Sequence, residues 1–296
     1  MTRRAWLMFA AVSLLWGVPY LFIKVAVGEV PPVTVVFVRV ALAASLLLPL
    51  AARRGALRGL ARRFPALVVL SLLEIAVPFV LISMGEQRIS SSLTGLLIAA
   101  LPLFVALLAL RFDRAERVGG LRLLGLLLGI GGVALLLGLD VVGDAGQLVG
   151  AVLVLLATLC YAASTLVIKR SFSGVPMLGV VAVATAVATV LLAPPALALT
   201  PARLPGVEVV LSLSALGVLC TAAALVLYFG LIVEAGPSRA AVITYLNPAV
   251  AVILGVAILG EPLTPAIVLG FLLIIAGSLL ATQSSRRREI PAPAKP

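Results

Sequence analysis

Ten apolar runs, each long enough to cross a lipid bilayer, are separated along this chain by short gaps, and almost all Lys and Arg occupy every second gap. A bilayer core requires about 20 apolar residues per helix, and cytoplasmic loops collect Lys and Arg. Hydropathy and charge therefore predict the same fold: an all-α membrane protein with ten transmembrane helices and both termini cytoplasmic. We expect the spans at residues 5–27, 33–52, 65–84, 90–110, 119–139, 147–168, 177–199, 208–233, 239–259 and 265–283.

The composition excludes a soluble protein, because 63% of the residues are hydrophobic and the mean hydropathy is +1.28. A net charge of +11 would suggest nucleic acid in a soluble protein. Here the basic residues border membrane spans, so we expect the lipid bilayer and no nucleic acid as partner. Cys160 and Cys220 both lie inside spans, which argues against a disulfide framework.

The charge segregation fits an even number of spans. Eighteen of the 22 Lys and Arg fall on the predicted cytoplasmic side: Arg3, Arg4, Arg53, Arg54, Arg58, Arg62, Arg63, Arg111, Arg114, Arg117, Arg122, Lys169, Arg170, Arg239, Arg286, Arg287, Arg288 and Lys295. Six of the eleven acidic residues fall on the predicted outer side: Glu29, Glu86, Asp140, Asp144, Glu208 and Glu261. An odd number of spans would mix the two groups.

The chain also repeats itself at an offset of 145 residues, which places Trp16 on Tyr161 and Lys24 on Lys169. Further matches near this offset are Ala115-Glu116 with Gly260-Glu261, Gly125 with Gly270, Gly132 with Gly277, and Pro102 with Pro248. Each unit holds five spans, so the second must enter the membrane from the opposite side. We therefore expect a first five-helix repeat over 1–139, a second, inverted repeat over 140–284, and a basic cytoplasmic tail over 285–296. Inverted repeats are typical of secondary transporters.

Several motifs resemble a known family. They are Leu15-Trp16-Gly17 in the first span, Arg39 in the second, a proline at the centre of the fourth and ninth spans, Gly260-Glu261-Pro262-Leu263-Thr264, Gly270 and Ala276-Gly277. Together they resemble the EamA repeat of the drug/metabolite transporter superfamily, and the layout is similar to bacterial amino-acid exporters, especially the aromatic amino-acid exporter. The segment 111–117 departs from the pattern because it is more charged than the usual short turn. The resemblance implies efflux of small metabolites across a bacterial inner membrane.

Four spans carry a proline near mid-membrane: Pro19, Pro78, Pro102 and Pro248. A proline inside a helix frees the carbonyl four residues earlier, and in a bilayer such a carbonyl must face protein or a water-filled cavity. We expect Pro19, Pro102 and Pro248 to kink or gate their helices. Pro78 would free the carbonyl of Glu74 beside a possible substrate.

Two charged residues lie deep within spans. Glu74 is roughly 14 Å and Arg39 roughly 9 Å from the nearest membrane surface at about 1.5 Å per residue. Burying a charge at this depth costs free energy, so we expect each residue to have an oppositely charged partner or a functional role. One interpretation pairs Arg39 with Glu74 structurally. The other assigns them to substrate charge or to proton coupling.

Aromatic and polar side chains complete the candidate site. Trp16, Tyr20 and Lys24 share one helix face because they recur every four residues, and Tyr161, Thr165 and Lys169 make the same stripe in the second repeat. Lys24 and Lys169 are expected to reach the membrane surfaces. The substrate-binding candidates are Trp16, Tyr20, Arg39, Glu74, Pro78, Tyr161, Thr165, Tyr228, Thr244 and Asn247.

These features predict a secondary exporter of amino acids, with neutral and aromatic ones favoured, that works by alternating access with the substrate at the midplane. A carrier of another metabolite or of a lipid-linked substrate on the same fold stays open. An intramembrane enzyme is disfavoured because the chain has no His and no cluster of metal-ligand residues; we expect neither cofactor nor metal. Gly125 and Gly129 suit close helix packing, in a monomer or at the face of a homodimer.

Overall fold

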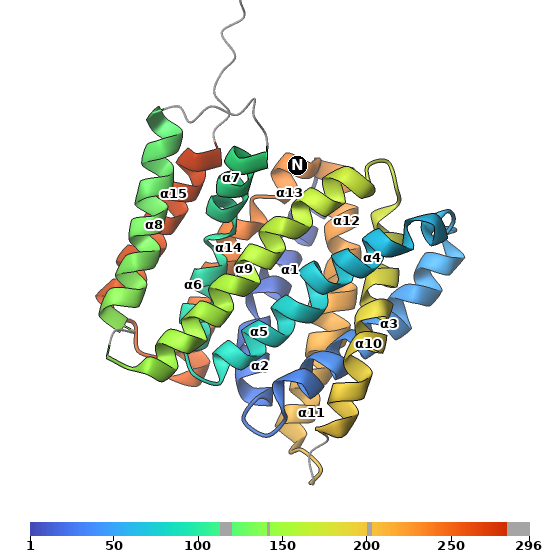
Figure 1. The fold of residues 1–296 in the computed structure, drawn as a ribbon, viewed down its shortest axis with the longest axis horizontal. Coiled ribbons are helices and arrows are strands. Elements are labelled where there is room, and N and C mark those ends of the chain that lie inside the picture. The colour runs from blue at the N-terminus through green and yellow to red at the C-terminus, as the bar shows by residue number, and fades with distance from the viewer. Residues whose placement is uncertain (113–119, 141–142, 200–202, 283–296) are drawn as a thin grey trace, which may run out of the picture.

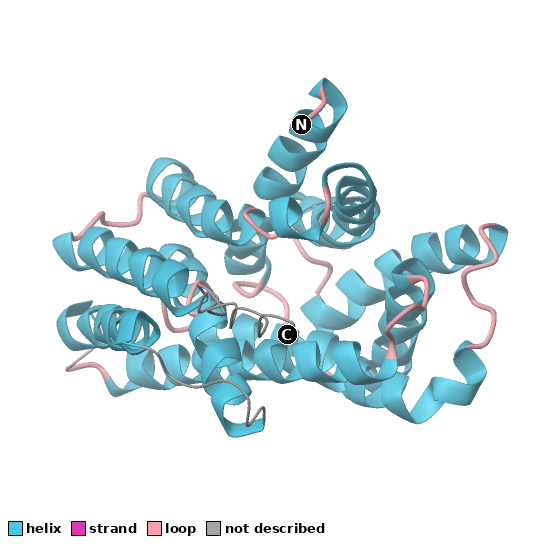
Figure 2. Cartoon of the chain, turned by 90° about the horizontal axis from the view of Figure 1, so that it is seen from above, coloured by secondary structure: helices cyan, strands magenta, loops and turns pink. Residues whose placement is uncertain are grey.

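The computed structural model describes residues 1–112, 120–140, 143–199 and 203–282, and every regular element in this part is a helix (Figures 1 and 2). The first half contains α1 Arg3–Gly17, α2 Pro19–Ala26, α3 Pro32–Arg53, η1 Leu60–Arg63, α4 Phe64–Ser71, η2 Leu72–Ala76, α5 Val77–Glu86, α6 Ser91–Ile98, α7 Leu101–Phe112 and α8 Gly120–Asp140. The second half contains α9 Ala145–Ser171, α10 Met177–Ala198, α11 Val207–Ser214, η3 Ala215–Ala223, α12 Ala224–Ala235, α13 Pro237–Ala240, α14 Ile243–Leu259 and α15 Pro265–Thr282.

These helices have the lengths that a bilayer requires. Within the described ranges, eight apolar helical stretches are long enough to cross a membrane, and two shorter ones cover 123–138 and 243–259. Many large apolar side chains face outward around the molecule, including Leu7, Val190 and Leu272 at 73%, 72% and 58% exposure. In water such a surface would be unstable. The ten predicted spans are thus all present, as ten helices of an all-α membrane protein.

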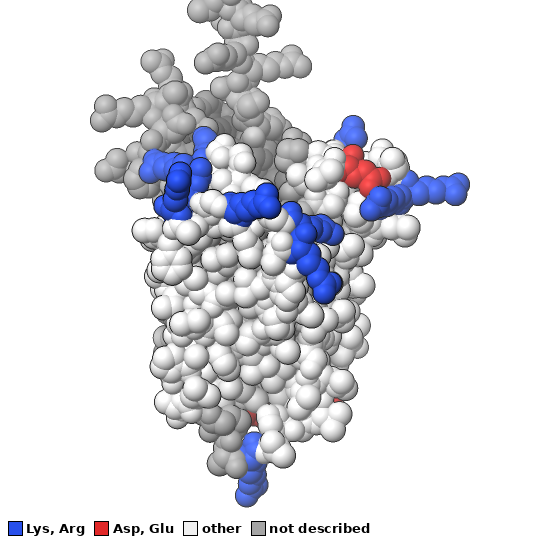
Figure 3. Space-filling model, turned by 90° about the vertical axis from the view of Figure 1, so that its right-hand side faces the viewer, with Lys and Arg blue, Asp and Glu red and all other residues white. Residues whose placement is uncertain are grey.

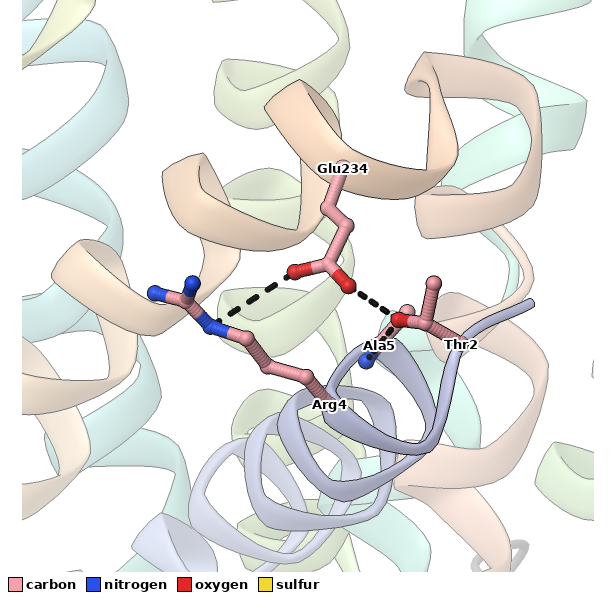
Figure 4. Close-up of polar contacts among 4 residues, drawn as sticks. All are labelled: Thr2, Arg4, Ala5 and Glu234. Atoms are coloured by element: carbon pink, nitrogen blue, oxygen red, sulfur yellow. Dashed lines mark hydrogen bonds and ion pairs between the residues drawn. The ribbon is translucent and has the colours of Figure 1, made fainter.

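Charged side chains gather toward one end of the molecule, with a broad uncharged band below them (Figure 3). We call this end the basic face; its exposed cations include those around the α3–α4 connection and at the end of α9: Arg53, Arg54, Arg58, Arg62, Arg63, Lys169 and Arg170. At this face the start of α1 is tied to the end of α12, because Glu234 contacts the Thr2 hydroxyl and lies 3.6 Å from Nε of Arg4 (Figure 4). The Thr2 hydroxyl also accepts a hydrogen bond from the Ala5 amide and so caps α1.

Helices α8 and α15 show the relation between the two halves most clearly. A Cβ added at Gly125 would lie 2.8 Å from the carbonyl oxygen of Gly277, and one added at Gly132 would lie 3.0 Å from that of Gly270. Gly270 and Gly277 are the residues that the 145-residue offset aligns with Gly125 and Gly132. Each contact therefore has its mirror across the pair, as two inverted repeats require. The glycines serve contact within the chain, rather than the dimer face that was the alternative.

A second shared feature lies in the third span of each half. A π-helical turn, η2, covers Leu72–Ala76, and another, η3, covers Ala215–Ala223, which includes the positions 145 residues later. Such turns often occur at functional sites because they leave carbonyls without their usual partners. Both turns border the centre of the molecule, where the candidate residues lie.

Only two of the four mid-membrane prolines interrupt their helices. The chain breaks between α1 and α2 before Pro19, and between α6 and α7 before Pro102. Pro78 is the second residue of α5, directly after the π-helical turn η2, and Pro248 lies inside α14. In the ninth span an interruption comes earlier, at 241–242, and α14 continues through Pro248; the role of Pro248 in kinking or gating stays a prediction.

Some predicted features lie outside the described residues. They include the tail 285–296 with Arg286, Arg287, Arg288 and Lys295, the residues Arg114, Glu116 and Arg117, and the side chains of Arg111, Arg122 and Asp140.

Candidate substrate site

A central cavity of about 380 Å³ lies between the two halves. Its wall includes residues near the basic face, such as Met177 at the start of α10 and Ile168 near the end of α9. On the other side it reaches Ile23 and Ile82, which are only 2% and 4% exposed and form its floor. The cavity therefore extends from mid-membrane toward the basic face and is closed toward the opposite face. Its volume is at the small end of the range for small-molecule pockets, about 300–1,000 Å³.

Aromatic rings form one wall of the cavity. The rings of Trp16 from α1 and Tyr228 from α12 pack with centroids 4.7 Å apart and tilted by 49°. Tyr20 and Tyr161 also line the space. Trp16 and Tyr161 are equivalent under the repeat, so each half contributes one ring of this repeat-related pair. Such a surface suits a flat or apolar group of a ligand.

Arg39 supplies the positive charge of the cavity. It lies on α3, is 8% exposed, and donates from Nε to the Thr221 hydroxyl at 2.9 Å. Its guanidinium carbon lies 3.9 Å from the centroid of the Phe79 ring, a cation–π contact that holds the planar group in place. Thr221 belongs to the π-helical turn η3 and donates to the carbonyl of Leu216 five residues earlier, at 2.8 Å. The guanidinium keeps further N–H donors for a ligand.

Glu74 supplies the negative charge, from the π-helical turn η2. Its carboxylate is hydrogen-bonded by the Ser164 hydroxyl of α9, which also lies 2.7 Å from the carbonyl oxygen of Tyr161. In the part of the chain that the structure describes, Glu74 and Arg39 form no ion pair with each other. The expectation of a structural Arg39–Glu74 pair is therefore wrong. Each charge instead has a neutral hydroxyl partner from the second half, Thr221 for Arg39 and Ser164 for Glu74.

Polar groups of α14 face the same cavity. Thr244 and Asn247 both line it. The Thr244 hydroxyl donates to the carbonyl of Ala241 at 2.8 Å. With its nitrogen turned toward carbonyls, the Asn247 amide donates to Ile243 at 3.0 Å and to Ser13 at 3.2 Å. Asn247 thus connects α14 to α1.

Of the candidates predicted from sequence, the cavity brings together Trp16, Tyr20, Arg39, Glu74, Tyr161, Thr165, Tyr228, Thr244 and Asn247, with Pro19, Pro102 and Pro248. Pro78 is buried in α5 and does not line it. Ser164, Thr221 and Phe79 were missed. Ser164 could have been found, because the repeat aligns it with Pro19; the sequence gives no comparable signal for Thr221 or Phe79.

The closed end of the cavity, on the side that the sequence predicts to face outward, is held by polar contacts that we call the outer seal: Lys24, Glu86, Ile89, Ser91, Ser92 and Glu261. Lys24 donates from Nζ to the carbonyls of Glu86 and Ile89, at 2.6 and 2.8 Å, so its ammonium is engaged within the protein rather than reaching the surface as expected. The Glu261 carboxylate accepts from the amides of Ser91 and Ser92, at 2.7 and 2.9 Å, and caps α6. These contacts join α2, the α5–α6 turn and the α14–α15 loop.

Comparison with known proteins identifies a recurring unit. The sequence profile described as "EamA-like transporter family" matches residues 3–138 and, a second time, residues 148–283. The chain is 26% identical over 286 residues to "Uncharacterized transporter YoaV" of Bacillus subtilis (strain 168), covering 95% of this chain and 97% of that protein. It is 27% identical over 275 residues to "Uncharacterized inner membrane transporter YedA" of Escherichia coli (strain K12), covering 92% and 88%. A crystal structure with 22% identity shares the fold, with a TM-score of 0.67 over 96% of this chain and 98% of the other.

Proposed function

Since the chain belongs to the EamA-like transporter family, we propose that it is a secondary transporter that exports amino acids, with neutral and aromatic ones favoured, by alternating access. The family has transporters and not enzymes as members, and one relative is an inner membrane transporter. We accordingly place this chain in the bacterial inner membrane as a multi-pass protein.

The observation that carries the substrate class is the separation of Arg39 and Glu74. An amino acid has a carboxylate and an ammonium group, each of which needs an opposite charge in a low-dielectric site. Arg39 offers donors to the carboxylate, and Glu74 offers acceptors to the ammonium. Neither charge is neutralised by an ion pair with the other. The ring pair of Trp16 and Tyr228 offers an apolar surface to the side chain.

The same cavity disfavours larger anionic substrates. A phosphate ester would call for two or more cations, and the lining contains one, Arg39, among the described residues. The volume of about 380 Å³ suits one small metabolite. Repeat-related helices on both sides provide the two bodies that rock against each other during alternating access.

The direct test is uptake of a panel of amino acids, a nucleoside, a phosphate ester and a polyprenyl phosphate into proteoliposomes that contain the purified protein. We expect saturable uptake of phenylalanine and related neutral amino acids, and competition among them. Uptake of the phosphate ester or the polyprenyl phosphate without uptake of any amino acid would contradict the proposal.

The orientation is part of the proposal: the basic face is cytoplasmic, as the positive-inside rule predicts. The test uses single cysteines at exposed positions, in a chain whose Cys160 and Cys220 are replaced by serine. We expect Leu204→Cys to react with an impermeant maleimide added to intact cells and Arg58→Cys to react only after permeabilisation. Labelling of both from outside would contradict the orientation.

A further inference from the structure

The outer seal contains a carboxyl group with no hydrogen-bond partner. Glu86 is the last residue of α5 and is 0% exposed, although the sequence predicted it on the outer surface. Neither of its carboxyl oxygens has a hydrogen-bond partner among the described residues, and the nearby hydroxyls of Ser83 and Ser91 also lack one. A charged carboxylate in such a place would lose its hydration without any donor in return.

The surroundings of Glu86 are charged but leave its carboxyl group free. Its charged neighbours are Lys24 on α2, Glu261 on the α14–α15 loop and, farther away, Arg39 on α3. Lys24 donates two of its three N–H groups to backbone carbonyls of the α5–α6 turn. The Glu261 oxygens are engaged with the start of α6. On α9, the residues nearest to the adjacent Gly85 are Gly150 and Val154, and both are uncharged.

The position of the group on its helix adds to this argument. The C-terminal end of a helix carries partial negative charge, so a carboxylate is unfavourable there and a cation is favourable. Lys24 occupies the favourable role at the end of α5. A neutral carboxylic acid is the form of Glu86 that fits the closed seal.

Tyr20 and Ile82 place the cavity within about one helical turn of this group. Tyr20 lines the cavity and lies one turn before Lys24 on α2, whose ammonium donates to the carbonyl of Glu86. Ile82, one turn before Glu86 on α5, belongs to the cavity floor. The carboxyl group is therefore separated from the cavity by about one helical turn.

We propose that Glu86 is a proton-binding site of the transport cycle, placed in the outer seal apart from the substrate cavity. When the seal opens, the carboxylate takes up one proton from the outer solution and becomes a neutral acid. In the closed seal seen here it is buried in that form. Release of the proton through the cavity toward the basic face leaves a charged carboxylate that the closed seal does not fit, so the seal reopens, and one external proton has been exchanged for substrate. This inference rests on the proposed transport function.

The first test is independent of substrate. Infrared spectra of the full chain in lipid vesicles are recorded across a pH titration, and the carboxylic acid C=O band is followed. We expect Glu86→Gln to remove one component of this band that persists at neutral pH, and Glu208→Gln, a change at an exposed carboxylate at the start of α11 on the same face, to leave that component in place. Glu74→Gln identifies the contribution of the cavity carboxyl group. An unchanged band in Glu86→Gln would overturn the proposal.

The second test follows transport of phenylalanine. The measured quantity is the ratio of uptake with and without an imposed pH gradient. Glu86→Gln should bring this ratio to about one, because a proton drives transport only through a site that binds it differently in the two states. Glu208→Gln should keep the wild-type ratio. A wild-type ratio in Glu86→Gln, or stimulation by a sodium gradient instead of a proton gradient, would overturn the assignment. If wild type takes up no amino acid, the proposed substrate class fails while the infrared test still decides the proton site.

A stability control separates a proton site from a structural ion pair. A carboxamide resembles the neutral acid, so Glu86→Gln should melt at the wild-type temperature near neutral pH. A large drop in melting temperature that Lys24→Met reverses in the double variant would show an ion pair and overturn the proposal.

Discussion

The first half of the chain supplies both charged side chains of the cavity, Arg39 and Glu74, whereas the second half supplies their uncharged hydroxyl partners, Thr221 and Ser164. The two halves nevertheless share their helix order, their π-helical turns and the glycine contacts between α8 and α15. The backbone plan is therefore symmetric, while the polar chemistry is not. A symmetric backbone suits two opposite-facing states of similar energy, and an asymmetric lining suits a substrate whose two ends differ.

The first helix of each half shows the same contrast. The chain breaks between α1 and α2 at Pro19, whereas α9 runs without interruption through Ser164, the equivalent position. The break sets the direction of α2, which carries Tyr20 and Lys24 into the cavity wall and the outer seal. The straight α9 instead presents Ser164 to Glu74. At this one repeat-related position, Pro19 thus accompanies a helix break in the first half, and Ser164 contacts Glu74 in the second.

The largest effect is expected at the positive charge. Arg39→Gln should abolish measurable phenylalanine uptake, because loss of one member of a buried charge contact costs about 2–5 kcal/mol. Thr221→Val removes only the hydroxyl partner and should reduce uptake far less. Purified variants in proteoliposomes give both values. Equal uptake by Arg39→Gln and wild type would show that the charge asymmetry has no part in binding.

Glu74→Gln should weaken phenylalanine binding by about 1.5–3 kcal/mol, the contribution of a charge-assisted hydrogen bond. Because Glu74 does not pair with Arg39, the variant should melt near the wild-type temperature. Calorimetry of binding and a melting curve measure the two effects. If Glu74→Gln destabilised the protein and the added Arg39→Gln change restored its stability, the two residues would form a structural pair. That result would contradict the separate roles of the two charges.

The shared backbone plan is tested at adjacent glycines of α8. A Cβ at Gly132 meets the backbone of α15, whereas one at Gly131 meets open space. Gly132→Ala should therefore cost about 1–3 kcal/mol of stability through overpacking, and Gly131→Ala less than about 0.5 kcal/mol. Gly277→Ala should resemble Gly132→Ala in thermal melts. A stable Gly132→Ala protein would contradict close contact between the two repeats.

The smallest effect concerns the helix caps. Hydrogen bonds hold the pKa of Asp144 below its ordinary value. The largest contribution comes from the backbone amide of Gln147, followed by the Gln147 side chain and the backbone amide of Gly146. The cap on α9 thus contributes stability above the unfolded pKa, which is lost as pH falls through the folded pKa. The Thr2 cap on α1 has no such dependence. Asp144→Asn should flatten the acid side of the melting-temperature profile slightly, and Thr2→Ser should not; an unchanged profile in Asp144→Asn would contradict the assignment.

The sequence predicted the fold well because the bilayer simplifies the problem. Apolar length and Lys/Arg placement determine the spans, and the 145-residue offset aligns the glycines that meet between α8 and α15. The sequence also selected most of the polar and aromatic residues that line the cavity, because such side chains are conspicuous inside apolar spans.

The details that failed depend on contacts between helices. Glu74 and Thr221 lie in the π-helical turns, and no periodicity in the sequence predicts these turns. The burial of Glu86 follows from the packing of α2, α6 and the α14–α15 loop around the end of α5. A residue at the end of a span is exposed or buried according to its neighbours, which one sequence does not reveal.

The central claim, that the two halves together bind an amphoteric substrate, is tested most directly by calorimetric titration of the purified protein with three ligands. They are phenylalanine, phenethylamine, which lacks the carboxylate, and 3-phenylpropanoate, which lacks the ammonium. We predict that phenylalanine binds at least about tenfold more tightly than either partial ligand. Its advantage over phenethylamine should disappear in Arg39→Gln, and its advantage over 3-phenylpropanoate in Glu74→Gln. Equal binding of all three ligands by the wild-type protein would contradict the account.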